Sequence, residues 1–350
     1  MRAWTTTCLG SPRQALSFQP TRPVPSLPPT NPRLVLIRVT HSALNPADLV
    51  LLHTAPPWLP FRRSPVPGQD FVGEVVALPA NPLPAELRGL RVGDRVGGAT
   101  GLWDVALGRG SLAEYMVIDA GSVAVVPEGI ESRQAVGLMG IAGQTAVEMI
   151  RRAGFVPGDG KVARVLVNGA SGGVGTVLVQ ALKGMGKEVV AVCSAANAEM
   201  VRELGADEVI DYKVHDPLER HLAAEFGEKQ FDAILDCVGN QALYAHSPGY
   251  LKPDGKFISI VGGWSQGIIP YARNKLLPVF LGGVPRSFHM FLLSASGETA
   301  KKAAQWFKQG LIKQVPIDSE FPLEQGIEAF EKLATKRAKG KIIINVAGTS

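Results

Sequence analysis

Hydrophobic positions follow two different patterns along the chain, and the change between them lies near residue 160. In the first part, short alternating or β-branched segments are separated by glycine and proline turns, a pattern typical of a β-rich, barrel-like domain. The strands that this pattern predicts cover 33–40, 71–77, 93–98 and 111–118, and the apolar spacing predicts a helix over 132–153.

The second part alternates apolar runs with helical stretches, which predicts a parallel sheet covered by helices. Its first run, at 162–170, is apolar almost throughout, as in a strand buried on both faces. Further strands are predicted at 187–193, 208–212, 231–239, 256–263 and 287–293, and helices at 174–185, 199–206 and 218–227. Helices at 297–310 and 322–338 and a strand at 339–346 break this alternation, so we expect the C-terminal segment to return to the first domain.

These patterns predict an α/β protein with a β-rich barrel domain and a doubly wound parallel sheet of the Rossmann type. We expect the barrel domain to span 1–125 and to be completed by 296–350, and the Rossmann domain to span 126–295. With 46% hydrophobic and 19% charged residues, the chain has the composition of a globular protein with a sizeable core.

Charge and cysteine content exclude several classes of function. The net charge of +5 is mild, and no run of lysine or arginine is long enough to predict nucleic-acid binding. The sequence contains no stretch of about 18 uncharged apolar residues, so it predicts no membrane-spanning helix. Its three cysteines have no CxxC spacing, and they predict neither a disulfide framework nor a structural zinc site. No acidic residue precedes Asp48, which is typical of a transit peptide. The prolines between residues 20 and 32 would break the helix that such a peptide forms, so we expect a cytoplasmic rather than a mitochondrial protein.

A glycine-rich turn joins the predicted strand at 162–170 to the helix that follows it. The turn consists of Ala170, Ser171, Gly172, Gly173, Val174 and Gly175. Gly172 allows backbone to approach a pyrophosphate, Gly175 allows the helix to pack close to the strand, and the helix N-terminus offers free N–H groups to phosphates. The strand–turn–helix context predicts a dinucleotide site, the alternative being a tight turn without a ligand.

The end of the second Rossmann strand indicates which dinucleotide binds. NAD sites usually carry Asp or Glu here for the ribose 2′-hydroxyl, whereas this chain has Cys193 and Ser194, followed by Asn197. No carboxylate at this place repels a 2′-phosphate, Ser194 and Asn197 can donate hydrogen bonds, and Tyr212 and Lys213 add a phenol and a charge. We therefore predict NADPH as the cofactor; a cap on the following helix is the other role open to Ser194.

Several segments, taken in order, resemble the medium-chain dehydrogenase/reductase superfamily over nearly the whole chain. They are MRAW at the start, Asn45-Pro46-Ala47-Asp48, Pro67-Gly68-Gln69-Asp70-Phe71-Val72-Gly73-Glu74-Val75, Val92-Gly93-Asp94-Arg95-Val96, Gly110-Ser111-Leu112-Ala113-Glu114-Tyr115, Gly143-Gln144-Thr145-Ala146, the glycine turn, Leu204-Gly205-Ala206-Asp207, Phe231-Asp232 through Asp236-Cys237-Val238-Gly239, and Lys339-Gly340-Lys341. The chain is similar to zinc-free members near the quinone oxidoreductases and the reticulon-interacting-protein group. This resemblance implies a GroES-like fold for the first domain, and it leaves little room for a presequence.

The resemblance also bears on metal chemistry. Zinc-dependent relatives hold the metal with a Cys early in the first domain and a His in a later Gly-His-Glu, where this chain has Asn45-Pro-Ala-Asp48 and Gly68-Gln69-Asp70. Without those ligands there is no Lewis acid to polarise an alcohol or a carbonyl. The resemblance therefore implies no metal site, and it favours hydride transfer to an electrophilic acceptor such as a quinone, an enal or an enone.

Candidate site residues follow from the same resemblance. Asn45 is a candidate donor to the nicotinamide ribose or a substrate oxygen, and Asp48 is a candidate to cap a helix or orient Asn45. Relatives often carry a tyrosine after this segment; here His53 is the candidate acid, with a surface histidine as the alternative. Cofactor contacts are also implied for Thr145, Val238, Val261 and Gly262.

The expected substrate is a small, hydrophobic electrophile, which the variable segment 263–286 would bound. Candidate contacts are Trp58, Trp264, Tyr271 and Phe280. A core position is the alternative for Trp58, and a packing or dimer-contact loop is the alternative for the segment. In the family the sixth Rossmann strand, here 287–293, often pairs with a second copy, so a homodimer is expected.

The lead interpretation is a zinc-independent, NADPH-dependent reductase that transfers hydride to a quinone or an α,β-unsaturated carbonyl. An enoyl reductase of a biosynthetic pathway has the same fold and cofactor and stays open as an alternative. A protein that binds NADPH for a partner or trafficking role, with little turnover, is a second alternative. A zinc alcohol dehydrogenase would require stoichiometric zinc.

Overall fold

The computed structural model describes two compact units. It covers residues 1–59, 62, 64–80, 84, 89–101, 104–105, 107–261 and 268–348, with backbone alone for 268–271. The first unit comprises Met1–Gln144, Ser294–Gln305 and Gln314–Ser350, and the second comprises Thr145–Leu293 and Trp306–Lys313. The first unit reaches past the expected boundary at 125 because the helix Ser132–Met139 (α4) packs on its strands.

The first unit is built mainly of β-strands, with four short helices among its described residues. Its elements are β1 (Ala3–Thr6), α1 (Pro12–Ala15), β2 (Leu16–Gln19), β3 (Leu34–Leu44), α2 (Pro46–Thr54), β4 (Asp70–Ala77), β5 (Arg95–Ala99), β6 (Tyr115–Asp119), β7 (Val123–Val125), α4, β14 (Ile317–Pro322), α12 (Gly326–Ala334) and β15 (Lys341–Asn345). The helices α5 (Ile141–Ala153) and α11 (Gly297–Lys308) belong partly to each unit.

A sheet of seven strands, counted over the described residues, forms the body of the first unit. The strand order is β14, β15, β3, β4, β5 and β7, and β6 pairs with β3 beside them. Because β15 pairs antiparallel with β3, the last strand of the chain lies against residues from its beginning. The pairing places Ile342 opposite Leu44, so residue 341 lies beside the start of α2.

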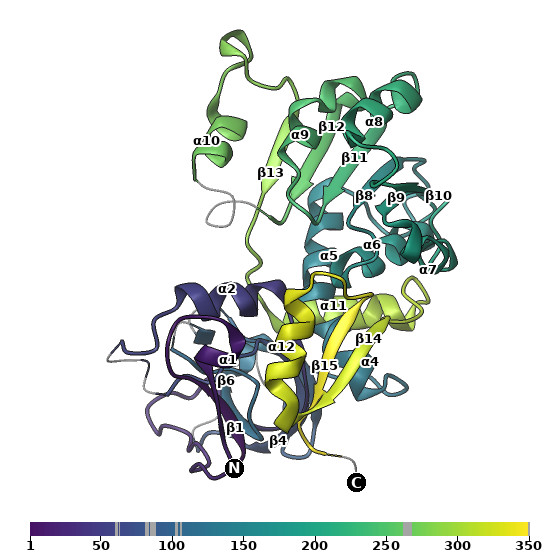
Figure 1. Ribbon diagram of the computed structural model, residues 1–350. Helices are drawn as coiled ribbons and strands as arrows, with labels where there is room; N and C mark the ends of the chain where they lie inside the picture. The colour runs from purple at the N-terminus through teal and green to yellow at the C-terminus, as the bar shows by residue number, and fades with distance from the viewer. Residues whose placement is uncertain are drawn as a thin grey trace. The chain divides into compact units, whose positions relative to one another are not determined.

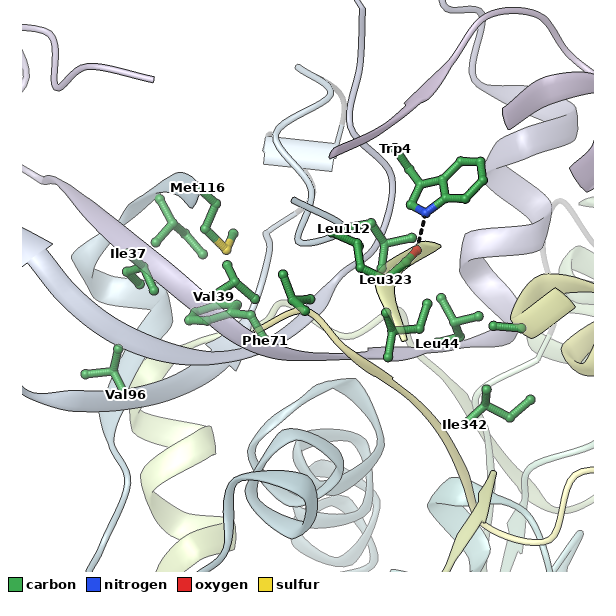
Figure 2. Packing of buried hydrophobic residues seen from close by; sticks show 14 of the residues in the cluster. Trp4, Ile37, Val39, Leu44, Phe71, Val96, Leu112, Met116, Leu323 and Ile342 are labelled. Carbon is green, nitrogen blue, oxygen red and sulfur yellow. Dashed lines mark hydrogen bonds between the residues drawn. The ribbon is translucent and has the colours of Figure 1, made fainter. Parts of the chain in front are cut away.

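The core of the first unit combines residues from both ends of the chain. Figure 2 shows Phe71, Leu44 and Ile342 among its buried side chains. Trp4 is buried at one end, where its indole N–H donates a hydrogen bond of 2.6 Å to the carbonyl oxygen of Leu323. This core holds β3, β4 and β15 together, and these three strands carry the polar groups described below.

The single helix predicted over 132–153 is wrong, because the chain breaks at Gly140 into α4 and α5. Gly140 has an extended backbone, and a Cβ atom there would lie 2.4 Å from Cγ of Asp70. The side chain of Asp70 occupies this space and accepts the N–H of Ile141 at 2.7 Å.

The predicted strand at 111–118 is shorter than expected, since β6 begins at Tyr115.

The second unit contains six parallel strands and their connecting helices, counted over the described residues. Its elements are β8 (Arg164–Asn168), α6 (Gly173–Gly184), β9 (Glu188–Cys193), α7 (Ala198–Glu203), β10 (Glu208–Asp211), α8 (Leu218–Phe226), β11 (Phe231–Asp236), α9 (Gln241–Ala245), β12 (Leu251–Ser259), α10 (Ile268–Leu276) and β13 (Ser287–Met290). Figure 1 shows these strands side by side. Every neighbouring pair is parallel.

The strand order of the second unit is that of a Rossmann sheet. Along the sheet the strands run β10, β9, β8, β11, β12 and β13, which is the order 3-2-1-4-5-6 in the sequence of the unit. The order reverses between β8 and β11, and dinucleotides bind outside the carboxyl ends of the strands at this kind of switch point. The predicted α/β class, with a β-rich part and a doubly wound parallel sheet, is confirmed.

Candidate active site

The first polar cluster lies where β3 gives way to α2. Asn45 is the residue before the helix, and Pro46 at its first position fixes a helical φ without needing an N–H acceptor. Oδ2 of Asp48 accepts the backbone N–H of Asn45 at 2.7 Å, which closes the first turn. Both side chains are buried, with 4% of Asn45 and 1% of Asp48 exposed.

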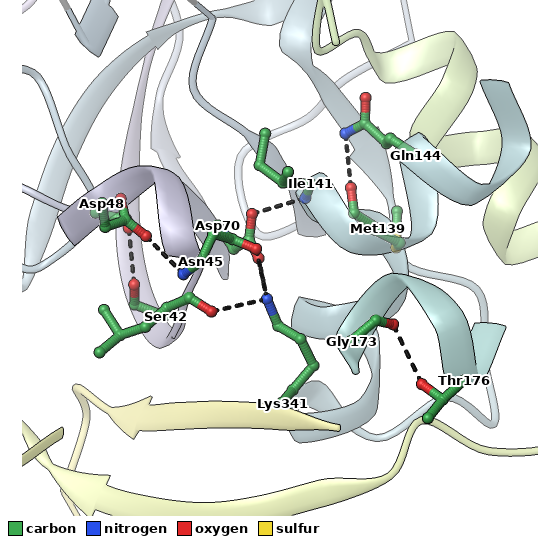
Figure 3. Close-up of polar contacts among 12 residues, drawn as sticks. Ser42, Asn45, Asp48, Asp70, Met139, Ile141, Gln144, Gly173, Thr176 and Lys341 are labelled. Carbon is green, nitrogen blue, oxygen red and sulfur yellow. Dashed lines mark hydrogen bonds and ion pairs between the residues drawn. The ribbon is translucent and has the colours of Figure 1, made fainter. Parts of the chain in front are cut away.

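Lys341, at the start of β15, points its ammonium group into this cluster, as Figure 3 shows. Its Nζ donates to the carbonyl oxygen of Leu44 at 3.0 Å, to Oδ1 of Asn45 at 2.8 Å, and to Oδ2 of Asp70 at 3.0 Å. Lys341 is 3% exposed and Asp70 is fully buried. A buried ammonium is tolerated only where a counter-charge and hydrogen bonds replace its water, and this site supplies both.

Burial determines the protonation state of Asp48, the other acid of this cluster. It raises the pKa of Asp48 to about 7, and the negative charge of Asp70 adds to the rise, whereas the N–H of Asn45 and the charge of Lys341 oppose it. Asp48 is therefore an acid that changes its charge near neutral pH. Asn45 and Asp70 keep fixed partners beside it.

A small pocket in the first unit lies beside Asp48. Its polar lining includes Asp48, Gln69 and Arg62. Oδ1 of Asp48, Oε1 of Gln69 and Nε of Arg62 are buried and have no hydrogen-bond partner among the described residues. Buried polar atoms are normally paired, so these three atoms are available to a polar partner outside the described residues.

The donor atoms of this cluster do not suit zinc. Asn45 and Gln69 offer amide oxygens at the two places where zinc-dependent relatives carry Cys and His, and Oδ1 of Asn45 is already bonded to Lys341. Within the described residues, no three His, Cys, Asp or Glu side chains come close enough together to bind a metal ion.

Two residues predicted for the first unit lie away from the cluster. His53 is on the last turn of α2 and is exposed, whereas Asn45 and Asp48 are buried at the first turn of that helix. Trp58 is 67% exposed, so it does not belong to the core of the unit. The structure does not bring His53 to the buried acid and amide.

The glycine turn of the second unit leads from β8 into α6. Its N-cap is Gly172, where a Cβ atom would meet only the carbonyl oxygen of Gly169, at 3.5 Å. At Gly175, by contrast, an added Cβ atom would lie 2.2 Å from the same oxygen. Space is therefore open at Gly172 for a ligand, while Gly175 is required by packing. The first N–H groups of α6 have no side-chain cap, which fits a phosphate.

Polar groups surround the ends of β9 and β10. Nδ2 of Asn197 donates to Oγ of Ser171 at 3.0 Å, and Oδ1 of Asn197 is buried without a hydrogen-bond partner. Ser194 makes no side-chain cap bond to the following turn. Tyr212 is 48% exposed, and Asp211 beside it accepts the N–H of Lys213. The hydroxyl groups of Ser194 and Tyr212 can donate to a phosphate. No carboxylate ends β9, while Asp211 of β10 lies opposite Cys193.

Asp236, at the end of β11, is a functional candidate that the sequence analysis missed. Its carboxylate accepts the backbone N–H groups of Val238 and Gly239, each at 3.0 Å, and that of Asn240 at 3.2 Å. Asn168 and Ser259 donate to it from the neighbouring strands β8 and β12. Burial raises the pKa of Asp236, and four of these donors oppose the rise, those on Val238, Gly239, Asn168 and Ser259. Asp236 thus fixes the loop that follows the switch-point strand.

The remaining predicted site residues have varied surroundings. Thr145 and Ala170 are buried, Val174 and Val261 are half-buried, and Val238 is 55% exposed. Gly262 and Trp264 lie outside the described residues, as does the side chain of Tyr271. Phe280 is 84% exposed.

The sequence analysis names Asp70 and Lys341 only as parts of motifs and assigns neither of them a role. The signal for Lys341 was present, since it is a charged residue opening the apolar run Lys341–Asn345. A lysine directly before three isoleucines belongs to a buried strand and needs a buried partner. Sequence alone does not say which of the 31 acidic residues that partner is.

Comparisons with known proteins identify the family. A model described as the alcohol dehydrogenase GroES-like domain matches residues 31–128, and one described as zinc-binding dehydrogenase matches 204–344. The medium chain reductase pydE of an Acremonium species is 33% identical over 99% of both chains. The trans-enoyl reductase poxH of Penicillium oxalicum is 31% identical, over 99% of this chain and 98% of its own.

A solved structure shows the same fold. The quinone oxidoreductase from Coxiella burnetii superposes with a TM-score of 0.78 over 99% of both chains, at 23% identity. None of the helices in the described part of the chain is both long and apolar enough to cross a membrane. The chain belongs to the medium-chain dehydrogenase/reductase superfamily of oxidoreductases, which bind a nicotinamide cofactor, among its quinone oxidoreductase-like, zinc-free members.

Proposed function

We propose that this protein is a zinc-independent, NADPH-dependent reductase that transfers hydride to a quinone or an α,β-unsaturated carbonyl. The observation that carries this proposal is the pair of amides, Asn45 and Gln69, at the places of two zinc ligands. Amide side chains bind zinc poorly compared with thiolate and imidazole. A substrate of this enzyme must therefore be electrophilic before it binds.

The choice of NADPH rests on the end of β9. The hydroxyl group of Ser194 makes no cap bond and can donate to a 2′-phosphate, and Ser194 carries no charge that repels it. The open space at Gly172 and the uncapped start of α6 suit the pyrophosphate of the same cofactor. When bound, the cofactor supplies the hydride.

The buried cluster of the first unit supplies the other requirements of the reaction. Hydride transfer to an enone or a quinone leaves negative charge on an oxygen, which must be stabilised and then protonated. The open Nδ2–H of Asn45 is a donor for such an oxygen. Asp48, with a pKa raised by burial to about 7, is about half protonated at neutral pH, and its proton lies on Oδ1 because Oδ2 accepts the N–H of Asn45. We therefore favour Asp48 over the exposed His53 as the proton source.

The experiment that tests this proposal measures oxidation of NADPH with a small panel of acceptors. The panel contains a naphthoquinone, an ortho-quinone, a 2-alkenal and an enoyl thioester, with NADH and a metal chelator run beside it. Oxidation of NADPH that resists the chelator supports the proposal. Binding of NADPH without oxidation by any member of the panel would contradict it and favour a role in partner binding.

An enoyl reductase of a biosynthetic pathway is a second candidate for the same site. The full-length similarity to poxH, which is named a trans-enoyl reductase, favours it. The two candidates differ in the acceptor, because an enoyl reductase acts on a thioester carried by a larger group. A kcat/KM for the enoyl thioester at least about tenfold above those for the free quinones and the alkenal would favour this candidate.

We also propose a cytoplasmic location and a homodimer that pairs along β13. This strand is the outer strand of the described parallel sheet, and Phe280, Leu281 and Leu292 near it are strongly exposed. An unpaired sheet edge with apolar neighbours favours pairing with a second copy. Sedimentation at several protein concentrations tests the dimer, and imaging of a tagged chain in cells tests the location.

A further inference from the structure

The side-chain amide of Asn45 has one fixed end and one open end. Oδ1 accepts a hydrogen bond of 2.8 Å from Nζ of Lys341. Nδ2 is buried and has no partner among the described residues. Rotating the amide by half a turn would place its NH2 group against an ammonium group, two donors facing each other, so Lys341 fixes the orientation. The N–H groups of Asn45 therefore point away from Lys341.

Lys341 itself has no donor left for a ligand. An ammonium group carries three N–H bonds, and Nζ of Lys341 has three acceptors, on Leu44, Asn45 and Asp70. With 3% of the residue exposed, it meets almost no solvent. Lys341 can thus influence a bound molecule only through a neighbour.

Both carboxylate oxygens of Asp70 are also engaged. Oδ2 accepts from Lys341 at 3.0 Å, and Oδ1 accepts the N–H of Ile141 at 2.7 Å. Asp70 therefore balances the charge of Lys341 and anchors it to the start of α5. Figure 3 shows these side chains directed toward one another, with Asn45 between the ion pair and the start of α2.

We propose that Lys341 is a positioning residue, which locks the amide of Asn45 so that Nδ2–H donates to an oxygen atom of the bound molecule. This inference rests on the proposed function, in which the first unit receives an oxygen-bearing ligand. The ligand oxygen is a carbonyl oxygen of the substrate or a ribose hydroxyl of the cofactor, and both are acceptors of the same kind. The buried, unpartnered Nδ2 is the donor that such an oxygen requires.

The test is a double-mutant cycle in which one change is made at Asn45 and the other at the ion pair of Lys341 with Asp70. Asn45→Ala removes the donor, and Lys341→Met with Asp70→Asn removes the ion pair without leaving a lone buried charge. Each variant is expected to lower kcat/KM at least about tenfold, the value of one lost hydrogen bond. The comparison is made near pH 5.5, where Asp48 is mostly protonated and the charges of the ion pair change its ionisation little. There the triple variant is expected to lose no more than Asn45→Ala alone, because Lys341 acts through Asn45. Losses that multiply would overturn the proposal, as would full activity after Lys341→Met with Asp70→Asn.

The chain offers a control in another ion pair that contains a buried lysine. Lys187 is 1% exposed and bonds Asp159 at 2.7 Å, within the second unit. Lys187→Met with Asp159→Asn neutralises a similar pair that does not touch Asn45. This control is expected to keep kcat/KM within about threefold of the unaltered protein, although its thermal stability falls. A loss of tenfold in the control would show that any buried pair has this effect, and it would overturn the positioning role.

Separate measurements identify the source of the oxygen. If it is a ribose hydroxyl, Asn45→Ala and the ion-pair variant raise the Kd for NADPH. If it is a substrate oxygen, the Kd for NADPH stays unchanged, while kcat/KM for the acceptor falls. No change in either quantity would overturn the proposal.

A spectroscopic readout keeps the proposal testable if turnover fails or if the ion-pair variant does not fold. In the unaltered protein labelled with 15N in asparagine side chains, the Nδ2 signal of Asn45 is assigned by its loss in Asn45→Ala. Addition of NADPH, or of a naphthoquinone after NADP+, is expected to shift this signal. A protein that turns over no acceptor but shows the shift would refute the proposed function alone. A signal that responds to neither addition would refute the role of Lys341 and Asn45.

Discussion

Nδ2 of Asn168 donates a hydrogen bond of 2.9 Å to Oδ1 of Asp236, and so joins the ends of β8 and β11 where the strand order reverses. Dinucleotides bind at such switch points. The same carboxylate holds three successive N–H groups of the loop after β11. One buried acid therefore ties the glycine-turn strand to the loop beside it.

Asp236→Asn should weaken cofactor binding. One oxygen of the acid becomes an NH2 group, which faces donors on the loop and leaves them unpaired. We expect the Kd for NADPH, measured by its fluorescence, to rise at least about tenfold, and the free energy of unfolding to fall by about 1–3 kcal/mol.

The matched control is Asp232→Asn, at the opposite end of β11. Asp232 pairs with the half-exposed Lys252 and accepts the N–H of Arg164 at 2.8 Å, a bond that the amide oxygen of asparagine can still accept. Its substitution should therefore cost less than about 1 kcal/mol and leave the Kd unchanged. Equal effects of the two substitutions on the Kd would contradict the role given to Asp236.

The two glycines of the turn should respond differently to alanine. A methyl group at Gly172 enters open space, so the fold should keep its stability within about 0.5 kcal/mol, whereas the Kd for NADPH should rise at least about tenfold. A methyl group at Gly175 would lie 2.2 Å from the carbonyl oxygen of Gly169, and it should destabilise the protein by about 1–3 kcal/mol. Thermal unfolding and fluorescence titration measure both quantities. A stable Gly175→Ala protein, or unchanged binding by Gly172→Ala, would contradict this assignment.

Ser194→Asp should reverse the preference for NADPH over NADH. The new carboxylate at the end of β9 repels a 2′-phosphate and accepts a ribose 2′-hydroxyl. The ratio of kcat/KM for NADPH to that for NADH should fall at least about tenfold. Ser194→Asn, which has the same shape without the charge, is the control and should change the ratio little. A ratio that does not move in Ser194→Asp would place the 2′-phosphate elsewhere.

Asp48 should make the stability of the protein decrease as pH rises toward neutrality. Its pKa is about 7 in the folded protein and near its ordinary value of 3.8 when unfolded. The folded state therefore binds more protons between these values, so the free energy of unfolding falls from about pH 4 to about pH 7 and is constant above.

Asp48→Asn removes this contribution, which amounts to about 1.4 kcal/mol per pKa unit. Relative to the unaltered protein, the variant should thus gain stability between about pH 4.5 and pH 8 in urea unfolding. The exposed aspartate of β12, Asp254, provides the control substitution Asp254→Asn, which should not change this difference. A variant whose relative stability does not vary with pH would show that Asp48 is ionised in the folded protein.

Local patterns sufficed for much of the fold. The continuous apolar run of β8, the turn from Ala170 to Gly175 and the alternation after them predict a Rossmann sheet, because these features depend on neighbours in sequence. The break at Gly140 could not be predicted, because its cause is Asp70, a residue 70 positions earlier. Short strands such as β1 and β2, with four residues each, carry too few residues to show a period.

The candidate site divides in the same way. The glycines of the turn and the absence of an acidic residue at position 194 can be recognised in the sequence, because a turn and its strand are adjacent in the chain. The ion pair of Lys341 with Asp70 joins residues 271 positions apart, and it depends on the pairing of β15 with β3. The exposure of His53, beside the burial of Asp48 on the same helix, likewise follows from packing that the sequence does not display.

The most direct test of the central claim compares two acceptors of equal chain length, a 2-alkenal and the corresponding saturated aldehyde. The chelator-treated protein is mixed with NADPH and either acceptor, with a naphthoquinone as a third sample, and loss of NADPH is followed by absorbance. We predict oxidation with the alkenal or the quinone, none with the saturated aldehyde, and no effect of the chelator. Reduction of the saturated aldehyde that the chelator abolishes and zinc restores would contradict the account.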